Sequence, residues 1–431
     1  MMCLFKVTNR VTYMKSKRLV FLLCYLSFSF NCFAEFRAGI AFRNVTPDPL
    51  LPVSGGVGPS HKVTRKEGEL NVRALVLEQD NTRVAIVSAD FLGFPAALGN
   101  KVRAAIKEIP PQNILIGATH THSAPDCYGF PDGKGGTASD PKYLETVCTK
   151  MAEAINEAVS KLQPAKLKIA TGEAKGKIAY NYYADQLYDP RCSVIQALDA
   201  SGKPFATLVN YAVHPEVLGN SVGICSPDLI GPLYDRIAEK GGGTAIFMNS
   251  AQGGMVTADN RTPGGRDSRT WEECLRIGTL LADEALRIIE AAPQQASPKL
   301  ACFSRQLSLP VDSPLMRALM KQLPNGQAGE VKSVTTQFNV VNVGNAQILT
   351  IPGEALPNIG YYLKRKMHGQ NNLLFGLTND AFGYILTKED FGSFKRYEYV
   401  SRTSLGERTG EVLVEEALKF INDSPNPEKV D

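Results

Sequence analysis

Two of the chain's five histidines, His120 and His122, stand one residue apart in the segment GATHTHSAPD. The preceding residues 114–116, Ile-Leu-Ile, have the composition of a buried strand. Side chains two positions apart on a strand point to the same face, so we expect both imidazoles to converge on one point where the strand ends. A pair placed in this way could hold a metal ion, act as a catalytic pair, or form a hydrogen-bonded part of the core.

A third histidine, His214, follows an apolar strand pattern in the segment NYAVHPEVLG. Two strands that each end in histidine can bring their imidazoles to one point. Three histidines would suit zinc, which prefers nitrogen ligands and keeps one position open for water in catalytic sites. Oxygen ligands could come from Glu354, which follows a strand pattern in IPGEALPNIG, and from Tyr384, which follows a glycine in NDAFGYILTKEDF.

Each of these residues also has a purely structural interpretation. Glu354 would be favoured at a helix N-terminus by the helix dipole, Tyr384 could be a packing aromatic, and the histidines could be hydrogen-bonded core or surface residues. Asp90 ends the strand pattern 83–89, so it could orient a ligand histidine from behind or form a cap or turn. Residue types and spacing alone leave both interpretations open.

The elements that must position these residues alternate between strand and helix patterns along the whole chain. Asp140 and Pro141 begin one helix with a favourable cap and first turn. Because several strands are joined too tightly for helical crossovers, the alternation indicates an α/β layered domain with a mixed β-sheet flanked by helices. Helices are predicted at 140–162, 229–240, 271–290, 354–366 and 408–422. Strands are predicted at 74–78, 83–89, 113–118, 166–171, 193–198, 206–212, 244–249, 333–343, 346–351 and 372–377.

The first 34 residues have the pattern of a secretory signal peptide. A basic segment at 14–18 precedes an apolar run at 19–30, and the small residues before Glu35 predict cleavage near Ala34. The apolar run is short for a bilayer span, and no later stretch is long and apolar enough to cross a membrane. We therefore expect a secreted or periplasmic protein.

The remaining residues have a globular composition. The domain is predicted over 35–423, followed by a polar tail at 424–431. The formal net charge of +4 gives no reason to expect a nucleic-acid partner. Six cysteines follow the signal peptide, and an exported chain could pair them, but their spacing fixes no pairing. No C-x-x-C pair occurs, which argues against a cysteine zinc site: the six are Cys127, Cys148, Cys192, Cys225, Cys274 and Cys302.

The segments GATHTHSAPD, AVHPEV, IPGE and NDAFGY resemble, in order and context, the zinc-containing catalytic domain of the neutral, non-lysosomal ceramidases. The likeness extends to VSADFLGF before the first motif and to DPKYLETVCTKMAEAI after it, so it covers nearly all of the chain after the signal peptide. The THTHS segment is the most specific of these motifs. The chain is thereby identified as a divergent member of this family, with an α/β domain and one zinc ion.

The resemblance implies a role for each matching residue. His120, His214, Glu354 and Tyr384 correspond to the zinc ligands, and Tyr384 also lies among the catalytic groups. His122 corresponds to a catalytic histidine beside the metal. In such a site zinc activates water and polarises the amide carbonyl, and a neighbouring acid protonates the departing amine.

The chain departs from the family pattern in three places. In the segment NSAQGGMVTADN, Gly254 and Val256 stand where the family carries polar residues, among them a serine near the metal. Ser250 or Thr257 would have to supply that hydroxyl. AYNYYADQ keeps Asn181 but has Tyr182 in place of the arginine near the substrate carbonyl; tyrosine can donate a hydrogen bond but supplies no cation. The chain also ends soon after the last motif, which predicts that it lacks the family's C-terminal β-sandwich domain.

We therefore predict an exported zinc amidohydrolase that cleaves the N-acyl amide bond of ceramide or of a related N-acyl compound. Its partners would be a small-molecule or lipid amide, with transient contact to membrane lipid. Residues 313–323 could line a lipid groove, although one apolar helical face is more typical of core. The alternatives are a zinc esterase or amidase acting on a non-lipid substrate, and a zinc-stabilised binding protein without turnover.

Overall fold

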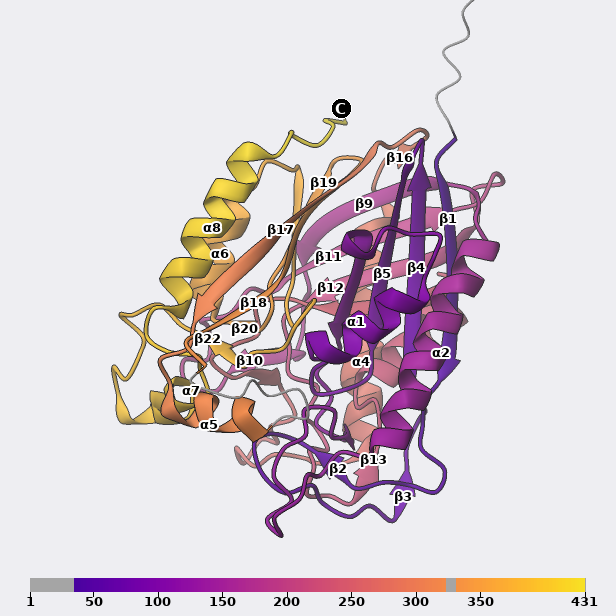
Figure 1. Cartoon of the computed structure of the whole chain (residues 1–431). Helices are drawn as coiled ribbons and strands as arrows, with labels where there is room; N and C mark the ends of the chain where they lie inside the picture. The colour runs from indigo at the N-terminus through magenta and orange to yellow at the C-terminus, as the bar shows by residue number, and fades with distance from the viewer. Residues whose placement is uncertain (1–34, 323–330, 431) are drawn as a thin grey trace, which may run out of the picture. The chain divides into compact units, whose positions relative to one another are not determined.

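The computed structural model of the chain describes residues 35–322 and 331–430 (Figure 1). The predicted signal peptide lies outside these residues. Three larger sheets form the domain. The first has the strand order β6-β5-β4-β1-β8 and consists of β1 (Arg37–Asn44), β4 (Asn71–Gln79), β5 (Thr82–Ala89), β6 (Ile114–Ala118) and β8 (Gln163–Pro164).

The second and third sheets follow along the chain. The second has the order β14-β12-β11-β9-β16 and consists of β9 (Lys166–Glu173), β11 (Arg191–Leu198), β12 (Pro204–Tyr211), β14 (Thr244–Asn249) and β16 (Gln294–Gln295). The third has the order β17-β18-β19-β21 and consists of β17 (Leu300–Pro310), β18 (Ser333–Val343), β19 (Ala346–Thr350) and β21 (Asn371–Phe375).

Short strand pairs tie the loops at one end of the sheets. β2 pairs with β7, β3 with β13, β10 with β15, and β20 with β22. Their bounds are β2 (Val53–Ser54), β3 (Arg65–Lys66), β7 (Ala124–Pro125), β10 (Ala179–Asn181), β13 (Ile224–Cys225), β15 (Val256–Ala258), β20 (Glu354–Ala355) and β22 (Tyr384–Ile385).

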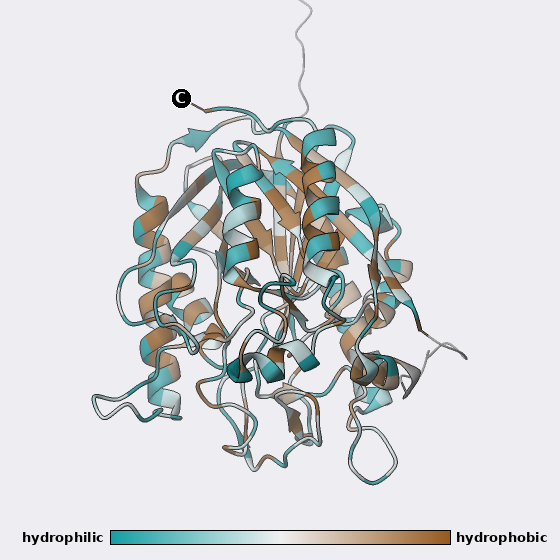
Figure 2. Ribbon diagram, turned by 90° about the vertical axis from the view of Figure 1, so that its left-hand side faces the viewer, coloured by the Kyte–Doolittle hydropathy of each residue, from teal (hydrophilic) through white to brown (hydrophobic). Residues whose placement is uncertain are grey.

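Each large sheet has helices on one face and the central core on the other. Helices α1 (Ala96–Ala105) and α2 (Pro141–Ser160) cover the first sheet, α3 (Ile230–Glu239) and α4 (Trp271–Glu290) the second, and α6 (Pro357–Lys366) and α8 (Thr409–Asp423) the third. Apolar side chains from all three sheets meet in one buried cluster. Figure 2 shows hydrophobic strand segments behind helices whose outward residues are largely hydrophilic, as burial of one helical face requires. The remaining helices are α5 (Pro314–Gln322), α7 (Glu398–Arg402) and the 3-10 turns η1 (Pro111–Asn113) and η2 (Lys395–Tyr397).

The predicted α/β layered class is confirmed, and each predicted strand and helix is present. Asp140 caps α2 by accepting hydrogen bonds from the backbone N–H groups of Lys142 and Tyr143. The start of the helix predicted at 354 is wrong: residues 354–355 are in strand β20, and the helix begins at Pro357. Because a residue before proline is driven out of helical backbone angles, Leu356 stays extended and the helix can begin only after it.

One parallel strand pair from each sheet ends at the same place. The pairs are β5 with β6, β12 with β14, and β19 with β21. Their carboxyl ends lead directly into the segments that carry the histidines, Glu354 and Tyr384. This meeting of three strand ends positions the candidate site, in agreement with the general rule that open α/β sheets bind ligands beyond the carboxyl ends of their strands.

Asn249, the last residue of β14, holds the three strand ends together. Its side-chain amide donates to the carbonyl oxygens of Thr119 at 3.0 Å and Val213 at 2.7 Å, and its side-chain oxygen accepts from the N–H of Val213. Its backbone carbonyl accepts from the N–H of Gly376, beyond β21. A fully buried side chain thus joins the segments that precede His120 and His214.

Replacing Asn249 with aspartate should destabilise the fold by about 3 kcal/mol. The substitution keeps the shape of the side chain but removes both amide donors, which leaves two buried carbonyl groups without partners and buries a carboxylate. Urea unfolding followed by circular dichroism measures the effect. Asn156→Asp, at an exposed position of α2, is the matched control and should change the stability little.

Two further observations bear on the sequence predictions. Within the described residues, no helix has the length and apolarity that crossing a membrane requires. All six described cysteines are unpaired thiols, and five of them are buried.

Candidate metal centre and active site

His120 and His122 converge as predicted, but not because they lie on a strand. Strand β6 ends at Ala118, and His120 has a left-handed backbone with φ of 75°. The N–H of His120 donates to the carbonyl of Phe91, which fixes this turn. The two imidazole rings then lie 4.8 Å apart between centroids, at right angles to one another. A strained turn thus produces the convergence that we expected from strand alternation.

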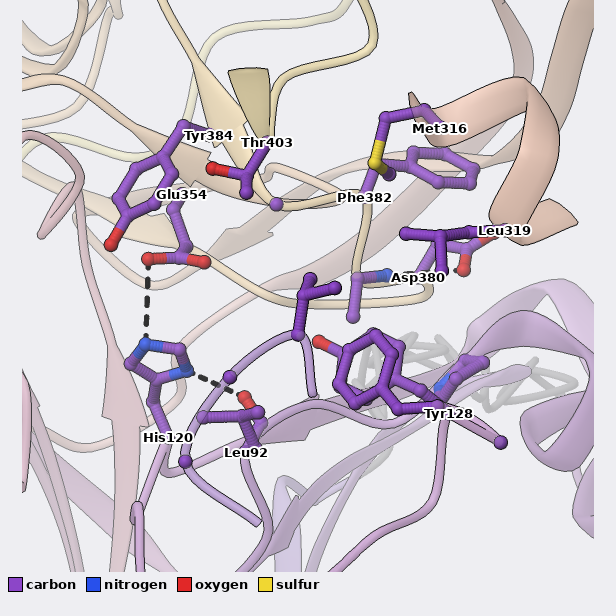
Figure 3. A pocket seen from close by; sticks show the side chains of 18 of the residues that line it. Leu92, His120, Tyr128, Met316, Leu319, Glu354, Asp380, Phe382, Tyr384 and Thr403 are labelled. Atoms are coloured by element: carbon purple, nitrogen blue, oxygen red, sulfur yellow. Dashed lines mark hydrogen bonds and ion pairs between the residues drawn. The ribbon is translucent and has the colours of Figure 1, made fainter. Parts of the chain in front are cut away.

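The side chains of four residues from three segments meet at one point. A carboxylate oxygen of Glu354, Oε2, lies 3.1 Å from His214 Nε2 and 3.4 Å from His120 Nε2. His122 Nε2 lies 3.3 Å from His120 Nε2. Figure 3 shows Glu354 and His120 facing each other across this point. His214, His120 and Glu354 are all buried.

The other ring nitrogens are held by groups behind the site. His120 Nδ1 lies 2.5 Å from the carbonyl oxygen of Leu92, and His214 Nδ1 lies 2.9 Å from that of Val256. A carbonyl can only accept, so each Nδ1 carries a proton, and each Nε2 faces the centre, where it either holds a proton toward Glu354 or, without that proton, presents a lone pair to a cation. The form that presents the lone pair is the one that a metal ligand requires.

His122 is oriented by a carboxylate that the sequence patterns did not single out. Its Nδ1 lies 3.5 Å from Oε2 of Glu216, two residues after His214. The N–H of His122 donates to the carbonyl of Pro215, so the two segments are also joined through their backbones. The only sequence signal for Glu216 is its place directly after the His-Pro pair in AVHPEV.

The donor atoms fit one metal ion. Ligands about 2.1 Å from a tetrahedral ion lie about 3.4 Å from one another, and Glu354 Oε2 lies 3.1 Å from His214 Nε2 and 3.4 Å from His120 Nε2. The ligand nitrogens of His120, His122 and His214 all lie within 4.8 Å of one another. Imidazole nitrogens with one carboxylate oxygen are a donor set that suits zinc.

The charges of the site attract a cation. Burial favours the neutral form of Glu354, but His120 and His214 outweigh it and hold the pKa of this carboxyl below its usual range. Burial would lower the pKa of His214, but its hydrogen bond with Glu354 raises it overall. Burial, together with repulsion from His120 and His214, lowers the pKa of His122 well below that of free histidine. His122 is therefore neutral at pH 7 and able to accept a proton.

Tyr384 lies beside this cluster, next to Glu354 (Figure 3). Strand β22 pairs with β20 so that Tyr384 is opposite Glu354. Its hydroxyl lies 3.1 Å from the Met255 sulfur, and its ring stacks on His214 with centroids 6.4 Å apart. Burial and the neighbouring Glu354 raise the pKa of the phenol well above its usual value. The ligand role of Tyr384 stays a prediction.

Asp90 directly follows β5, and its side chain contacts Asn71 and Thr119 rather than a histidine ring. One carboxylate oxygen accepts from the N–H of Asn71 at 2.8 Å, and the acceptor that orients His120 is Leu92 instead. The predicted role of Asp90 behind a ligand histidine is therefore replaced by a backbone carbonyl. Asp90 is 1% exposed, and burial raises its pKa to about 7 despite the attraction of Arg73.

Ionisation of Asp90 should make the fold less stable as the pH rises. The pKa in the folded chain lies above the unfolded value of about 3.9, so the unfolded chain loses its proton first and stability falls between about pH 4 and pH 7. Asp90→Asn cannot ionise, so its stability relative to the unmodified chain should rise over this interval by up to about 4 kcal/mol. Urea unfolding of both proteins at several pH values measures the difference. A difference that stays constant with pH would contradict a raised pKa.

Asn181 ends strand β10 and Tyr182 follows it, and their role in binding substrate stays a prediction. The buried side chain of Asn181 closes its own loop, accepting from the N–H of Tyr183 and donating to the carbonyl of Leu187. Tyr182 is 54% exposed, and its ring lies 5.8 Å from the guanidinium carbon of Arg396. Neither residue is among those that line the pocket beside the metal centre within the described chain.

Of the two candidate hydroxyl residues, Thr257 bridges to His214 through backbone pairing, and Ser250 is buried with no partner for its hydroxyl in the described chain. Gly253 packs against the carbonyl of Glu354 so closely that a Cβ there would collide with it. The glycine-rich segment therefore supports Glu354 from behind rather than supplying a polar group to the pocket.

An apolar pocket opens directly onto the metal centre (Figure 3). His120, His122, Glu354 and Tyr384 form part of its wall. The rest of the wall is largely apolar and includes Leu92, Tyr128, Phe130, Met316, Leu319, Met320 and Phe382. Three of these come from α5, so the predicted groove wall in residues 313–323 does face the candidate site, whereas Leu315 lines a different cavity.

No family model matches the chain. Neutral ceramidase B of Dictyostelium discoideum is 29% identical over 179 residues, which are 36% of this chain and 25% of that protein. Neutral ceramidase of Pseudomonas aeruginosa is 25% identical over 255 residues, which are 53% of this chain and 38% of that protein. The matched segments thus span less than half the length of these relatives.

The fold matches over much more of the chain than the sequence does. The crystal structure of the neutral ceramidase from Pseudomonas aeruginosa superposes with a TM-score of 0.73 at 17% identity, covering 92% of this chain and 76% of that one. A structure described as ceramidase complexed with C2 gives a TM-score of 0.70 at 18% identity, with 92% and 77% covered. The chain is a distant homologue of the neutral ceramidases and shares their fold over nearly its whole described length.

Proposed function

We propose that the protein is an exported zinc-dependent amidohydrolase that cleaves the amide bond of an N-acyl compound. The observation that carries this proposal is the meeting of three imidazoles and one carboxylate, with metal-ligand spacing, at the wall of an apolar pocket. The distant homology to enzymes named neutral ceramidases supports amide hydrolysis over other reactions of such a centre.

His120, His214 and Glu354 would hold the ion, because their donor atoms face one point and their opposite sides are fixed by backbone contacts. Zinc bound there would supply the Lewis acidity that activates water and polarises the scissile carbonyl. Tyr384, which pairs opposite Glu354 and stacks on His214, would complete the ligand set through its phenol oxygen. The depressed pKa of Glu354 keeps this carboxylate charged and ready to bind a cation over the whole neutral range.

His122 would move the protons. It is neutral at pH 7, with its Nδ1 facing Glu216 and its Nε2 facing the centre. It can therefore accept a proton from the attacking water at Nε2 while the Glu216 carboxylate stabilises the imidazolium that forms. The same nitrogen can return this proton to the departing amine, which closes the cycle.

The substrate would be ceramide or another N-acyl amide that reaches the pocket from water or from a membrane surface. Export through the signal peptide, with cleavage near Ala34, is part of this proposal. An ester with the same acyl group is chemically compatible with the centre, and a binding protein would retain the metal without turnover. These are the outcomes that the following experiment separates.

Purified protein should first be analysed for metals and then assayed on a short-chain fluorescent ceramide, on simple N-acyl amides and on the matching esters. One zinc ion per chain together with hydrolysis of an amide supports the proposal. Hydrolysis of esters alone indicates an esterase, and bound zinc with no hydrolysis of any compound indicates a binding protein. A chain that binds no metal when zinc is supplied would refute all three interpretations.

A further inference from the structure

We infer, on the basis of the proposed function, that the substrate is a small amide carrying one compact apolar group of about six carbons next to the scissile bond, rather than a lipid with two long chains. The juxtaposition that supports this inference is a partly enclosed apolar pocket of limited volume on the metal centre. The size of the pocket, and not only its apolar character, defines the class of substrate.

The pocket encloses a volume of about 140 Å³. An apolar cavity of about 150 Å³ inside a protein holds one benzene molecule. The pocket therefore has room for one phenyl ring or a chain of about six carbons. A long acyl chain would have to leave its far end in water, where the added methylene groups gain no burial energy.

The lateral wall of the pocket is held in place by an aromatic pair. The rings of Tyr128 and Phe130 stack with centroids 4.7 Å apart and nearly parallel planes. The Tyr128 hydroxyl packs directly against Gly93. Any side chain at this glycine would collide with the hydroxyl. This wall cannot recede without disturbing the segment that carries Leu92, the carbonyl partner of His120.

The opposite wall is the helix α5. Its first turn is tied to the body, since the N–H of Ser313 donates to the carbonyl of Leu405 and the Arg317 side chain donates to the carbonyl of Val311. Met316 and Met320 also pack against the core of the third sheet. Figure 3 shows Met316 and Leu319 across the pocket from His120, with Tyr128 between the two ends. A group bound here would adjoin a carbonyl placed at the metal centre.

The test uses two series of amides with the zinc-loaded protein. In one series the acyl group grows from acetyl to palmitoyl on a fixed small amine, and in the other the amine grows on a fixed acetyl group. In the series whose growing group enters the pocket, we expect kcat/KM to rise about fourfold per methylene up to about six carbons and then to level off or fall. A kcat/KM that continues to rise to the palmitoyl compound would overturn the inference.

Variants of α5 test whether this helix limits the length of the group that the pocket can hold. Leu319→Ala should move the optimum to groups longer by about three carbons, and Leu319→Trp should move it to shorter ones. Leu315→Ala is the matched control, because this leucine lies on the same helix but lines another cavity. An optimum that is identical in all four proteins would show that α5 does not set the limit.

A binding measurement separates this inference from the proposed activity. Straight-chain hydroxamic acids chelate zinc, and their affinity for the zinc-loaded protein can be measured by calorimetry without turnover. Affinity that peaks at about six carbons supports the pocket limit even if no amide is hydrolysed. Affinity that grows steadily with chain length contradicts it, whatever the activity.

Discussion

Replacing His214 with alanine is expected to abolish zinc binding and amide hydrolysis together. His214 is fully buried, its Nδ1 is fixed by Val256, and its Nε2 lies 3.1 Å from the Glu354 carboxylate. Without this imidazole the remaining ligands hold metal poorly. Loss of the several kcal/mol that a bound metal contributes to the transition state should lower kcat/KM by about a thousandfold or more. His120→Ala should behave in the same way.

Metal content by mass spectrometry and kcat/KM on the best amide measure this prediction. His61→Ala and His368→Ala are the matched controls, because both histidines are exposed. They should retain zinc and full activity. If His214→Ala still bound one zinc ion per chain with unchanged affinity, the ion would lie somewhere other than the centre described above.

Replacing His122 with alanine is expected to keep the zinc and lower kcat by about a hundredfold to ten-thousandfold, the usual contribution of a general acid–base group. The imidazole differs from the other two in having a carboxylate, Glu216, 3.5 Å from its Nδ1. Glu216→Gln should lower kcat less, since its amide oxygen can still accept from Nδ1. Metal content, kcat and KM of each variant are the measurements.

Loss of zinc from His122→Ala would reverse the assignment. The distance of 3.3 Å between His122 Nε2 and His120 Nε2 would then be the separation of two ligands of one ion. In that case the ligand set would be three histidines and Glu354, and Tyr384, whose hydroxyl faces Met255, would have no place in it.

The elements of the fold could be predicted because their patterns are local. The cap at Asp140 and the continuous apolar character of strands such as 193–198 are determined by neighbouring residues, and both elements were confirmed. The start of the helix after Glu354 was wrong because the effect of Pro357 on Leu356 was overlooked. Strands β1 and β17 and helix α1 were not predicted.

The site could be predicted only in part, for a different physical reason. Spacing brought His120 and His122 together, and strand and turn context offered Glu354 and Tyr384, to which the family resemblance gave ligand roles. The grouping of three sheets around Asn249 depends on contacts between residues far apart in the sequence, such as Asn249 with Thr119. No local pattern specifies such contacts, and the same limitation applies to Glu216. The substrate-binding role of Asn181 and Tyr182 stays a prediction, because a matching motif does not fix where its loop lies.

The left-handed backbone of His120 has a consequence for protein engineering. Met255, Leu377 and Asn379, in the loops around the centre, share this conformation, which costs about 1–3 kcal/mol for a residue other than glycine. Only the surrounding packed sheets hold these residues in such angles. Excised loops would relax to other shapes, so this arrangement of histidines cannot be grafted onto an unrelated scaffold as short segments and has to be transferred with the whole domain.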